Sequence, residues 1–509
     1  MKKDREIPNI DEKQLQKNTI DLLKSIGYKF ISQEENVNLR DGKLNEVVLK
    51  DILVNQLQKL NNFEYKGITY PFSPKNIAKA ISDLDESLNE GLMTANTKVS
   101  DQLILGNSYQ EELIDGAKKS FSFKYIDFQN PKNNVYHFTE EFSVLRATQN
   151  EYEKTRRPDI VLFINGIPFA VIELKKSSVE TEQGISQMIR NQQRGEIGQL
   201  FKYIQITLAG NNHSPQYATT GTPKKFYATW EEDVSLELNS LITNRTPSKL
   251  DSTVYSLFNK SRVVQLLHSF IIFDNKIKKI ARYQQFFAIK EIAKKINVLD
   301  NTGRRAGGLI WHTQGSGKSL TMVMLTRVIK REILNSKVIV VTDRKDLDRQ
   351  IHSTFRNSEI EAQRAKNGKH LISLLQSGKS VITTLINKFE TVSREKVVIN
   401  DPNIFILVDE SHRTQSGSLN KAMKKTFPSS CYLGFTGTPL MKKEKSTISK
   451  FGGLLHKYTI DQAVKDGAVL PLLYEGRLVE QLVSDEKGLE RRFDIISRDL
   501  NEEQKRDLA

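Results

Sequence analysis

The chain has 509 residues, of which 76 are lysine or arginine and 61 are aspartate or glutamate, so its formal net charge is +15. A hydrophobic fraction of 38% excludes disordered and fibrous classes, and the length predicts several domains. The single cysteine, Cys431, excludes a disulfide framework and a thiolate zinc cluster. There is no signal-peptide pattern and no apolar run of about 20 residues, so we expect a cytoplasmic protein without a membrane span. The positive charge suits a polyanion-binding surface, although an ordinary basic surface would also explain it.

The N-terminal part of the chain predicts an α/β fold with a clear β-hairpin. The apolar residues 160–164 are followed by Asn165-Gly166 and by a second apolar run over residues 168–174. An Asn-Gly pair between two apolar runs is a strong signal for a tight hairpin turn. Spacing compatible with a helix follows over residues 181–203, and residues 203–208 are expected to form another strand.

Charged residues in this hairpin suit metal-dependent hydrolysis. Asp159 precedes the first run, and Glu173 and Lys175 lie at the end of the second. Residues two apart on a strand share a face, and the turn can bring Asp159 alongside. Two carboxylates form an oxygen site for Mg²⁺, and a neighbouring lysine can activate water or stabilise developing charge, as phosphodiester hydrolysis requires. The alternative is a solvated strand face with an ordinary ion pair, but unpaired charges inside an apolar run are costly.

From about residue 277 strands alternate with helices, which predicts a parallel sheet covered by helices on both faces. The expected strands are residues 309–311, 338–341, 381–384, 404–408 and 432–435. We therefore predict four segments in chain order: an N-terminal α/β domain, a connection, a second α/β domain and the start of an incomplete further domain. Their expected bounds are residues 1–240, 241–275, 276–465 and 466–509.

A glycine-rich loop between the strand at 309–311 and the next predicted helix indicates phosphate binding. Its sequence, His312-Thr-Gln-Gly-Ser-Gly-Lys-Ser319, has histidine where the strict pattern has glycine. Glycines let backbone N–H groups approach phosphate oxygens, the lysine neutralises the β- and γ-phosphates, and the final hydroxyl coordinates Mg²⁺. The predicted nucleotide-binding residues are Thr313, Gln314, Gly315, Ser316, Gly317, Lys318 and Ser319.

Other polar residues fit the same nucleotide site. Asp409 and Glu410 follow the buried strand 404–408, where Asp409 would hold Mg²⁺ and Glu410 would orient or deprotonate the attacking water. Gln284 has an amide that could read an adenine edge, although alone it would more often be an ordinary helix residue. Thr436-Gly-Thr-Pro439 follows the last predicted strand, where it could sense the nucleotide's state.

This set of motifs resembles the first RecA-like domain of superfamily 2 helicases and translocases. Residues 157–176, RPDIVLFINGIPFAVIELKK, resemble the nuclease core of the restriction (R) subunit of type I restriction-modification enzymes. The resemblance implies a PD-(D/E)xK endonuclease-like domain followed by a RecA-like P-loop motor, with Mg²⁺ and ATP as cofactors. It implies cleavage of unmethylated double-stranded DNA after translocation, at a site formed by Asp159, Glu173 and Lys175. The implied partners are the methyltransferase and specificity subunits.

Two other residues near the predicted nuclease site follow from the resemblance or from position. The family often carries Gln-x-x-x-Tyr on the helix after the lysine, which makes Gln187 a catalytic candidate, but Asn191 stands at the tyrosine position. Glu12, at the start of the first amphipathic helix, could be an additional metal carboxylate or an ordinary solvated helix start.

Residues 440–509 are too few for a complete second motor domain of about 150 residues. No Gln-x-x-Gly-Arg-x-x-Arg segment occurs there to supply the arginine that completes such ATP sites. We therefore expect an N-terminal part of a longer subunit, able to bind ATP but not to hydrolyse it efficiently. Two alternatives stay open: a DNA-repair or resection nuclease–translocase, and a non-catalytic fragment that binds DNA or a partner.

Overall fold

The structure is a computed structural model that describes residues 10–148, 154–394, 397–409, 417–437, 448, 451–471, 485–498 and 505. The chain divides into two compact units, residues 1–469 and 470–509. The helix described in the second unit is α19 (Glu486–Ile496), and both predicted sites lie in the first unit.

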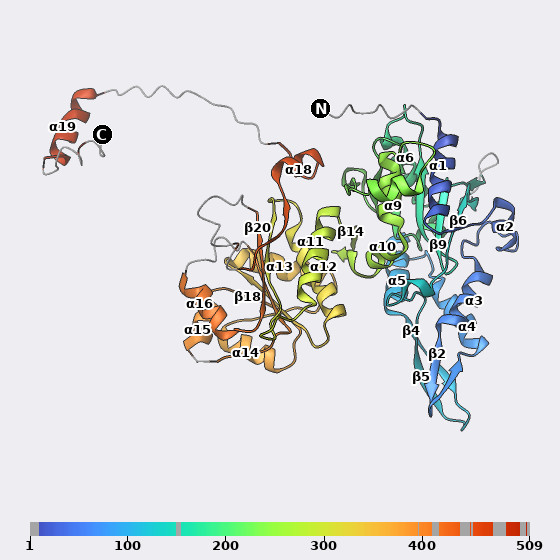
Figure 1. The fold of residues 1–509 in the computed structure, drawn as a ribbon, viewed down its shortest axis with the longest axis horizontal. Helices are drawn as coiled ribbons and strands as arrows, with labels where there is room; N and C mark the ends of the chain where they lie inside the picture. Colours follow the sequence, from blue (N-terminus) through green and yellow to red (C-terminus); the bar gives the residue numbers. More distant parts are fainter. Residues whose placement is uncertain are drawn as a thin grey trace. The chain divides into compact units, whose positions relative to one another are not determined.

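A six-stranded mixed sheet forms the centre of the N-terminal part (Figure 1). Its order is β1 (Lys29–Phe30), β6 (Tyr136–Glu140), β9 (Ile160–Ile164), β10 (Ile167–Leu174), β11 (Ile206–Gly210) and β12 (Gln216–Ala218). The antiparallel pair β9–β10 confirms the predicted hairpin, and its turn residues Asn165 and Gly166 have positive φ angles of 53° and 84°. Every residue of β10 is buried, so this strand lies at the centre of the core.

Helices that precede and follow the sheet strands in the chain pack on this sheet. α1 (Glu12–Ser25) packs on β10 and on α9 (Lys249–Phe258), and α6 (Thr181–Asn191) packs on β10 and β11. The predicted helix 181–203 is two helices, α6 and α7 (Gly198–Phe201), separated by a turn in which Gly195 has a φ of 89°. The predicted strand 203–208 begins three residues later, as β11. The carbonyls of Phe201, Lys202 and Ile204 accept hydrogen bonds from the Asn96 amide instead of from a neighbouring strand.

Two small hairpins and two helices precede the hairpin β9–β10 in the chain. β2 (Asn62–Tyr65) pairs with β3 (Ile68–Pro71), β4 (Asn107–Glu112) pairs with β5 (Lys118–Phe123), and Phe63 stacks on Phe121 between them. The remaining elements here are α2 (Gln33–Asn38), α3 (Lys50–Leu60), α4 (Pro74–Leu84), α5 (Leu92–Leu105), η1 (Pro131–Asn133), β7 (Val144–Leu145) and β8 (Thr155–Arg156).

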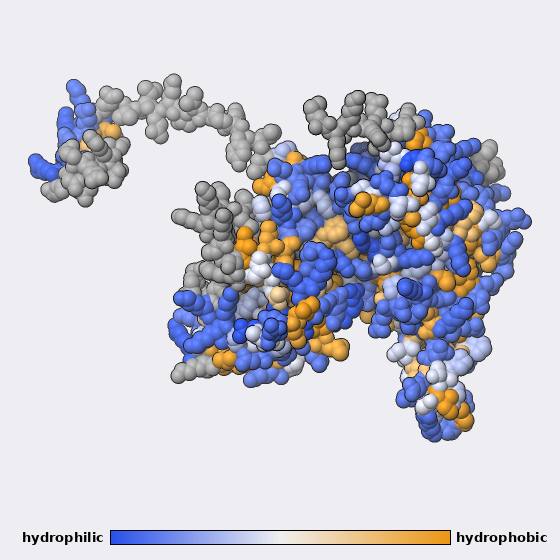
Figure 2. All heavy atoms as spheres, viewed as in Figure 1, coloured by the Kyte–Doolittle hydropathy of each residue, from blue (hydrophilic) through white to orange (hydrophobic). Residues whose placement is uncertain are grey.

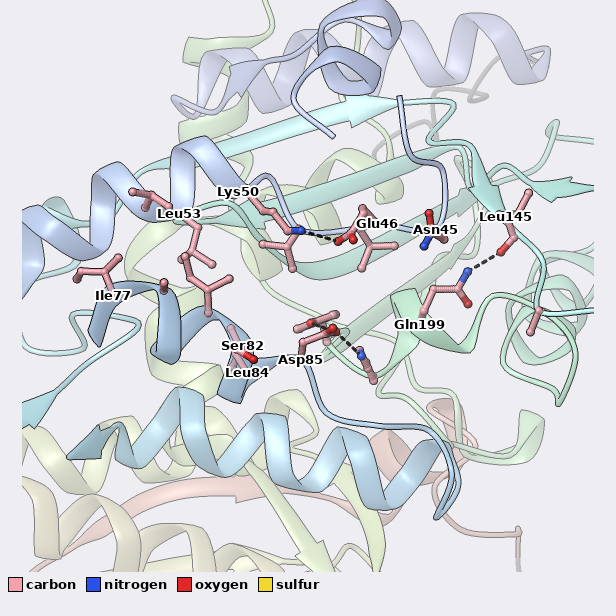
Figure 3. A pocket seen from close by; sticks show the side chains of 18 of the residues that line it. Asn45, Glu46, Lys50, Leu53, Ile77, Ser82, Leu84, Asp85, Leu145 and Gln199 are labelled. Carbon is pink, nitrogen blue, oxygen red and sulfur yellow. Dashed lines mark hydrogen bonds and ion pairs between the residues drawn. The ribbon is translucent and has the colours of Figure 1, made fainter. Parts of the chain in front are cut away.

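A cavity of about 900 Å³ lies between α3, α4 and the segment around Tyr203 (Figure 3). Its apolar wall includes Leu53 and Ile77, and ion pairs join Lys50 to Glu46 and Lys202 to Asp85 at its polar end. None of the residues that the sequence analysis assigned to a site lines this cavity.

The predicted connection is folded against the N-terminal sheet. Its residues, 241–275, contain α9, α10 (Lys260–Gln265), the π-helix η3 (Leu266–Phe270) and β13 (Ile271–Asp274). Before it in the chain lie η2 (Lys224–Phe226) and α8 (Ser235–Leu241), and after it β14 (Ile277–Ile280) pairs with β13. Lys278 of β14 is 2% exposed, and its ammonium contacts the side-chain oxygens of Asn96, at 2.6 Å, and Gln205. Burial holds the pKa of Lys278 well below its usual range. The proposed domain boundaries stay a prediction.

A seven-stranded sheet in which every pairing is parallel forms the second part, as predicted (Figure 1). Its order is β17 (Gln363–Arg364), β18 (Val381–Leu385), β16 (Lys337–Thr342), β19 (Ile404–Val408), β20 (Cys431–Thr436), β15 (Gly308–His312) and β21 (Leu454–Tyr458). Its helices are α11 (Tyr283–Ile296), α12 (Lys318–Glu332), α13 (Lys345–Asn357), α14 (Gly368–Gln376), α15 (Lys388–Arg394), α16 (Gly417–Thr426) and α18 (Ile460–Lys465).

Alternate residues of these strands belong to two different hydrophobic clusters. Val338 and Val340 lie in the cluster that contains the apolar residues of α11, α12 and α13, whereas Ile339 and Val341 lie in the cluster formed with α14, α15 and α16. Because successive strand residues point to opposite faces, helices cover both faces of the sheet. This arrangement confirms the prediction of a helix-covered parallel sheet.

Outside these cores, the face shown in Figure 2 is mainly hydrophilic, with scattered apolar patches. Within the described part of the chain, no helix is long and apolar enough to span a bilayer.

Candidate nuclease site and nucleotide site

The hairpin β9–β10 brings Asp159, Glu173 and Lys175 together. Ile160 pairs with Ile172, so Asp159, one residue before, lies beside Glu173, one residue after. The Asp159 carboxylate accepts a hydrogen bond of 2.6 Å from the backbone N–H of Leu174, which fixes it against β10. Lys175 Nζ lies 3.2 Å from Glu173 Oε1. The hairpin therefore places these three residues side by side, and their roles in catalysis stay a prediction.

Two flanking helices add polar groups to this cluster. From α6, the Gln187 amide donates a hydrogen bond to Glu173 Oε1. From the first turn of α1, Glu12 Oε1 lies 3.6 Å from Lys175 Nζ. Asn191, at the position of the family's tyrosine, is buried and faces the end of α6, where its side-chain oxygen accepts a hydrogen bond from Arg190.

The two buried carboxylates oppose each other electrostatically. Burial raises the pKa of Glu173 and of Asp159, and for Glu173 the charge of Asp159 raises the pKa further. Burial by itself would lower the pKa of Lys175, but the surrounding carboxylates outweigh this effect and leave the pKa raised. Lys175 therefore brings one positive charge to a cluster that contains three carboxyl groups, those of Glu12, Asp159 and Glu173.

This charge balance fits a divalent cation. Glu173 Oε2 is buried and has no hydrogen-bond partner in the described part of the chain. A hard cation such as Mg²⁺ takes carboxylate oxygens as ligands and would relieve the repulsion between Asp159 and Glu173. The described residues contain no group of three or more His, Cys, Asp or Glu side chains arranged to hold a metal. A bound ion would thus take further oxygens from water, backbone or substrate.

The phosphate loop of the second sheet has the backbone conformation that the glycine pattern predicts. Gly315 and Gly317 have φ angles of 82° and 87°, and α12 begins with Lys318 and Ser319 directly after them. The Ser316 hydroxyl donates to the Thr313 carbonyl at 2.6 Å, which closes the turn that contains Gln314. The start of α12 therefore stands at the carboxyl end of β15, where the helix dipole favours a phosphate.

Neighbouring strand ends converge on this loop. A Cβ added to Gly437, which directly follows β20, would lie 2.9 Å from Lys318 Nζ. Asp409 directly follows β19, is 6% exposed, and donates its N–H to the Val341 carbonyl at 2.9 Å. Glu410, the predicted water-positioning residue, lies outside the described residues, as do Thr438 and Pro439.

His312, the departure from the strict loop pattern, ends β15. Its Nε2 lies 2.9 Å from Nδ1 of His456 on the neighbouring strand β21. Burial lowers the pKa of His312 to about 3, so its side chain is neutral. The imidazole therefore packs against β21, and the left-handed turn of the loop rests on the two later glycines.

The glutamines before the loop differ in placement from the sequence expectation. Gln284 is 1% exposed, and neither of its amide atoms has a hydrogen-bond partner in the described part of the chain. Its neighbour Gln285 donates to the Gly317 carbonyl at 3.1 Å and accepts from the Arg282 N–H at 2.9 Å. Sequence reasoning named Gln284 and missed Gln285; the spacing of three between Arg282 and Gln285, which suits a helix-capping interaction, was the available signal. An adenine-binding role of Gln284 stays a prediction.

Comparison with known families matches both parts of the chain. Residues 9–226 match the family described as type I restriction enzyme R protein N terminus, and residues 284–506 match the SWI2/SNF2 ATPase family. The N-terminal part of the chain is therefore similar to type I restriction enzyme R proteins, and the C-terminal part is similar to SWI2/SNF2 ATPases. The chain combines sequence features of restriction endonuclease subunits with those of a helicase-like ATPase.

Curated relatives agree with this family over most of the chain. The putative type I restriction enzyme MjaIXP endonuclease subunit of Methanocaldococcus jannaschii is 29% identical over 505 residues, covering 94% of this chain and 47% of the relative. The type I restriction enzyme HindI endonuclease subunit of Haemophilus influenzae is 26% identical, covering 92% of this chain and 46% of the relative. The chain spans about half the length of the curated relatives it matches.

Among solved structures, the Sulfolobus solfataricus SWI2/SNF2 ATPase core in complex with dsDNA matches with 20% identity and a TM-score of 0.28, covering 35% of each chain. A nuclease-deletion mutant of the Type ISP restriction-modification enzyme LlaGI in complex with a DNA substrate mimic matches with 14% identity and a TM-score of 0.30. This match covers 44% of this chain and 23% of that one.

Proposed function

We propose that this chain carries the nuclease and the ATP-dependent DNA motor of a type I restriction enzyme, in the cytoplasm, and that it cuts unmethylated double-stranded DNA away from the recognition site after translocation. The observation that carries the proposal is the buried cluster of Asp159, Glu173 and Lys175 in one sheet, followed in the same chain by a phosphate loop at the edge of another. A PD-(D/E)xK nuclease domain and a RecA-like motor domain are the corresponding assignments.

In the nuclease site, Asp159 and Glu173 would hold Mg²⁺, whose Lewis acidity supports attack of water on a phosphodiester. Gln187 holds one oxygen of Glu173, which leaves Oε2 of the same carboxylate for the ion. Lys175 is kept protonated by the surrounding carboxylates and is placed to donate to a phosphate oxygen as negative charge develops there.

In the nucleotide site, backbone N–H groups of the loop from Thr313 to Ser319 would surround the phosphates of ATP, with Lys318 beside the β- and γ-phosphates. Ser319 and Asp409 would hold the Mg²⁺ of the nucleotide, and Glu410 would orient the attacking water. Gln285 stabilises this loop through the Gly317 carbonyl.

Sequence recognition would belong to partners rather than to this chain. We propose that a specificity subunit reads the DNA sequence and a methyltransferase subunit senses methylation, while this chain contacts the DNA backbone. A net charge of +15 supports backbone contact, because phosphate binding is largely electrostatic and independent of sequence.

The test is cleavage of an unmethylated circular plasmid by the intact subunit that contains this chain, reconstituted with its cognate methyltransferase and specificity subunits, Mg²⁺ and ATP. We expect cleavage by wild type, loss of cleavage with intact ATP hydrolysis in Glu173→Ala, and loss of both in Lys318→Ala. Cleavage that persists in Glu173→Ala would contradict the proposed nuclease site. Cleavage without the partner subunits and regardless of methylation would favour a repair or resection nuclease.

A further inference from the structure

A cavity of about 470 Å³ opens beside the candidate nuclease site, along the exposed face of α6. Lys175 and Gln187, the two residues that contact Glu173, form one wall. The other lining residues are Glu180, Glu182, Gln183, Ser186, Arg190 and Lys224. A phosphodiester that reaches Lys175 therefore has its neighbouring backbone in contact with this face of α6.

The three basic side chains that line this cavity, Lys175, Arg190 and Lys224, differ in how closely carboxylates neutralise their charge. Lys175 lies among carboxylates, and Lys224 forms an ion pair with Glu182. Arg190 is exposed, and within the described residues it forms no ion pair; its recorded hydrogen bond goes to a neutral amide oxygen. Carboxylates therefore neutralise its charge less directly than those of Lys175 and Lys224: Arg190 helps to lower the pKa of Glu196, but no ion pair joins the two in the described residues.

The position of Arg190 suits a neighbouring phosphate. Arg190 follows Gln187 by three residues on α6, so the two side chains share a helix face and start about 4.5 Å apart along the axis. Successive phosphates of one DNA strand are separated by about 3.4 Å along the duplex axis. A strand with one phosphate at Lys175 and Gln187 thus places the next phosphates within reach of the guanidinium.

The side chain of Asn191 is a hydrogen-bond acceptor for the Arg190 guanidinium. The Asn191 side chain is 1% exposed, and its Oδ1 accepts a hydrogen bond of 3.3 Å from Arg190 Nη2. Because the acceptor is buried at the end of α6, it limits the directions that the guanidinium can take. Its amide oxygen thus provides a buried acceptor for the guanidinium.

We propose that Arg190 binds a DNA phosphate adjacent to the one that is cut, and that Asn191 is a positioning residue that orients Arg190. The inference rests on the proposed nuclease function, but the binding it describes is measured without cleavage.

The first experiment measures binding of the intact subunit to a fluorescein-labelled 30-base-pair duplex in Ca²⁺, without ATP, over a range of NaCl concentrations. Each lost phosphate contact reduces the slope of log K against log salt by about 0.9. We expect this reduction in Arg190→Gln, with affinity lower by about 3- to 10-fold. The matched control is Arg194→Gln, an exposed arginine four residues later that does not line the cavity, and it should leave the slope unchanged.

The second experiment separates positioning from a structural role. Asn191→Ala should raise KM for DNA cleavage in the reconstituted complex with little change in kcat, and the double variant with Arg190→Gln should be no worse than Arg190→Gln alone. Asn191→Asp, which keeps the acceptor oxygen, should restore KM. If Asn191→Ala lowers only the melting temperature, or adds fully to Arg190→Gln, the positioning role is wrong.

An unchanged salt slope in Arg190→Gln, or an equal change in Arg194→Gln, would overturn the phosphate contact. If the salt slope of Arg190→Gln changes but the wild type never cleaves DNA, the phosphate contact of Arg190 is supported and the proposed nuclease function is wrong.

Discussion

The nuclease site and the nucleotide site both lie where strands end. The first depends on side chains, whereas the second depends on backbone conformation. The nuclease cluster depends on ionisable side chains that a fully buried strand holds close together, with Glu173 Oε2 left without a partner in the described part of the chain. The phosphate loop depends on backbone conformation, with left-handed Gly315 and Gly317 ahead of a helix start. The first site should therefore respond to protonation and metal, and the second to any side chain that disturbs the loop.

Sheet topology accounts for this difference. In the antiparallel pair β9–β10, the start of β9 and the end of β10 lie side by side at the open end of the hairpin, so Asp159 reaches Glu173 across the ladder. In the parallel sheet, the carboxyl ends of β15, β19 and β20 lie on one edge, so the loop that leaves β15 meets Gly437 there, and Asp409 follows a strand that ends on the same edge.

The largest effect is expected at the backbone-dependent site. In Gly317→Ala, the added Cβ would lie 2.8 Å from Nε2 of Gln285, at a φ of 87°. We expect affinity for a fluorescent ATP analogue to fall by about 100-fold, or about 2.8 kcal/mol, with no change in metal binding at the nuclease site.

The matched control is Gly378→Ala. Gly378 also has a left-handed φ, 78°, but nothing lies within 4 Å of an added Cβ. Equal loss of nucleotide affinity in both variants would show that general backbone strain, rather than the shape of the loop, governs binding.

An intermediate effect is expected when one buried carboxylate is neutralised. Burial and Asp159 raise the pKa of Glu173, so between the unfolded and folded pKa values the native state binds more protons than the unfolded state. The stability of the wild type is thus lost as pH rises through the folded pKa. Without metal at pH 8, Glu173→Gln should be more stable in urea unfolding by about 1–2 kcal/mol.

Added metal should reverse the order of stability of wild type and Glu173→Gln. Added Mg²⁺ or Ca²⁺ binds the native wild type and stabilises it, whereas Glu173→Gln should gain little. Glu34→Gln, an exposed glutamate on α2, is the control and should change neither value. If Glu173→Gln is less stable than wild type at pH 8 without metal, the proposed charge repulsion is wrong.

A third effect, in how stability changes with pH, concerns a buried cation in the hairpin β13–β14. Because the pKa of Lys278 is well below its usual range, the unfolded state binds a proton that the native state does not. Wild-type stability should therefore rise relative to Lys278→Met by up to about 1.4 kcal/mol per pH unit, until the unfolded lysine titrates near pH ~10.4.

Urea unfolding at pH 7, 8 and 9 measures this difference in slope. Lys279→Met is the control, since Lys279 is on the same strand but forms a partly exposed ion pair with Asp274. Parallel stability curves for wild type and Lys278→Met would show that Lys278 keeps its proton in the native state.

Much of both sites was predictable because their signals are local. The Asn165-Gly166 turn fixes the hairpin that joins Asp159 to Glu173, and the glycines before Lys318 fix the loop. The failures occurred where side chains from distant segments compete with regular structure. The Asn96 amide binds the carbonyl of Ile204, which lies in the part of the predicted strand that β11 lacks, and no local pattern shows a partner about 100 residues away.

The sequence by itself determined the order of the two parts, their main strands and the chemical types of the site residues, because hydrophobic period, turn residues and charge spacing act over short distances. The tertiary structure alone decided that Gln285, and not Gln284, holds the phosphate loop, that Glu12 approaches Lys175, and that Lys278 is buried. Each of these outcomes depends on which distant elements pack together, and burial then sets the charge state of the groups between them.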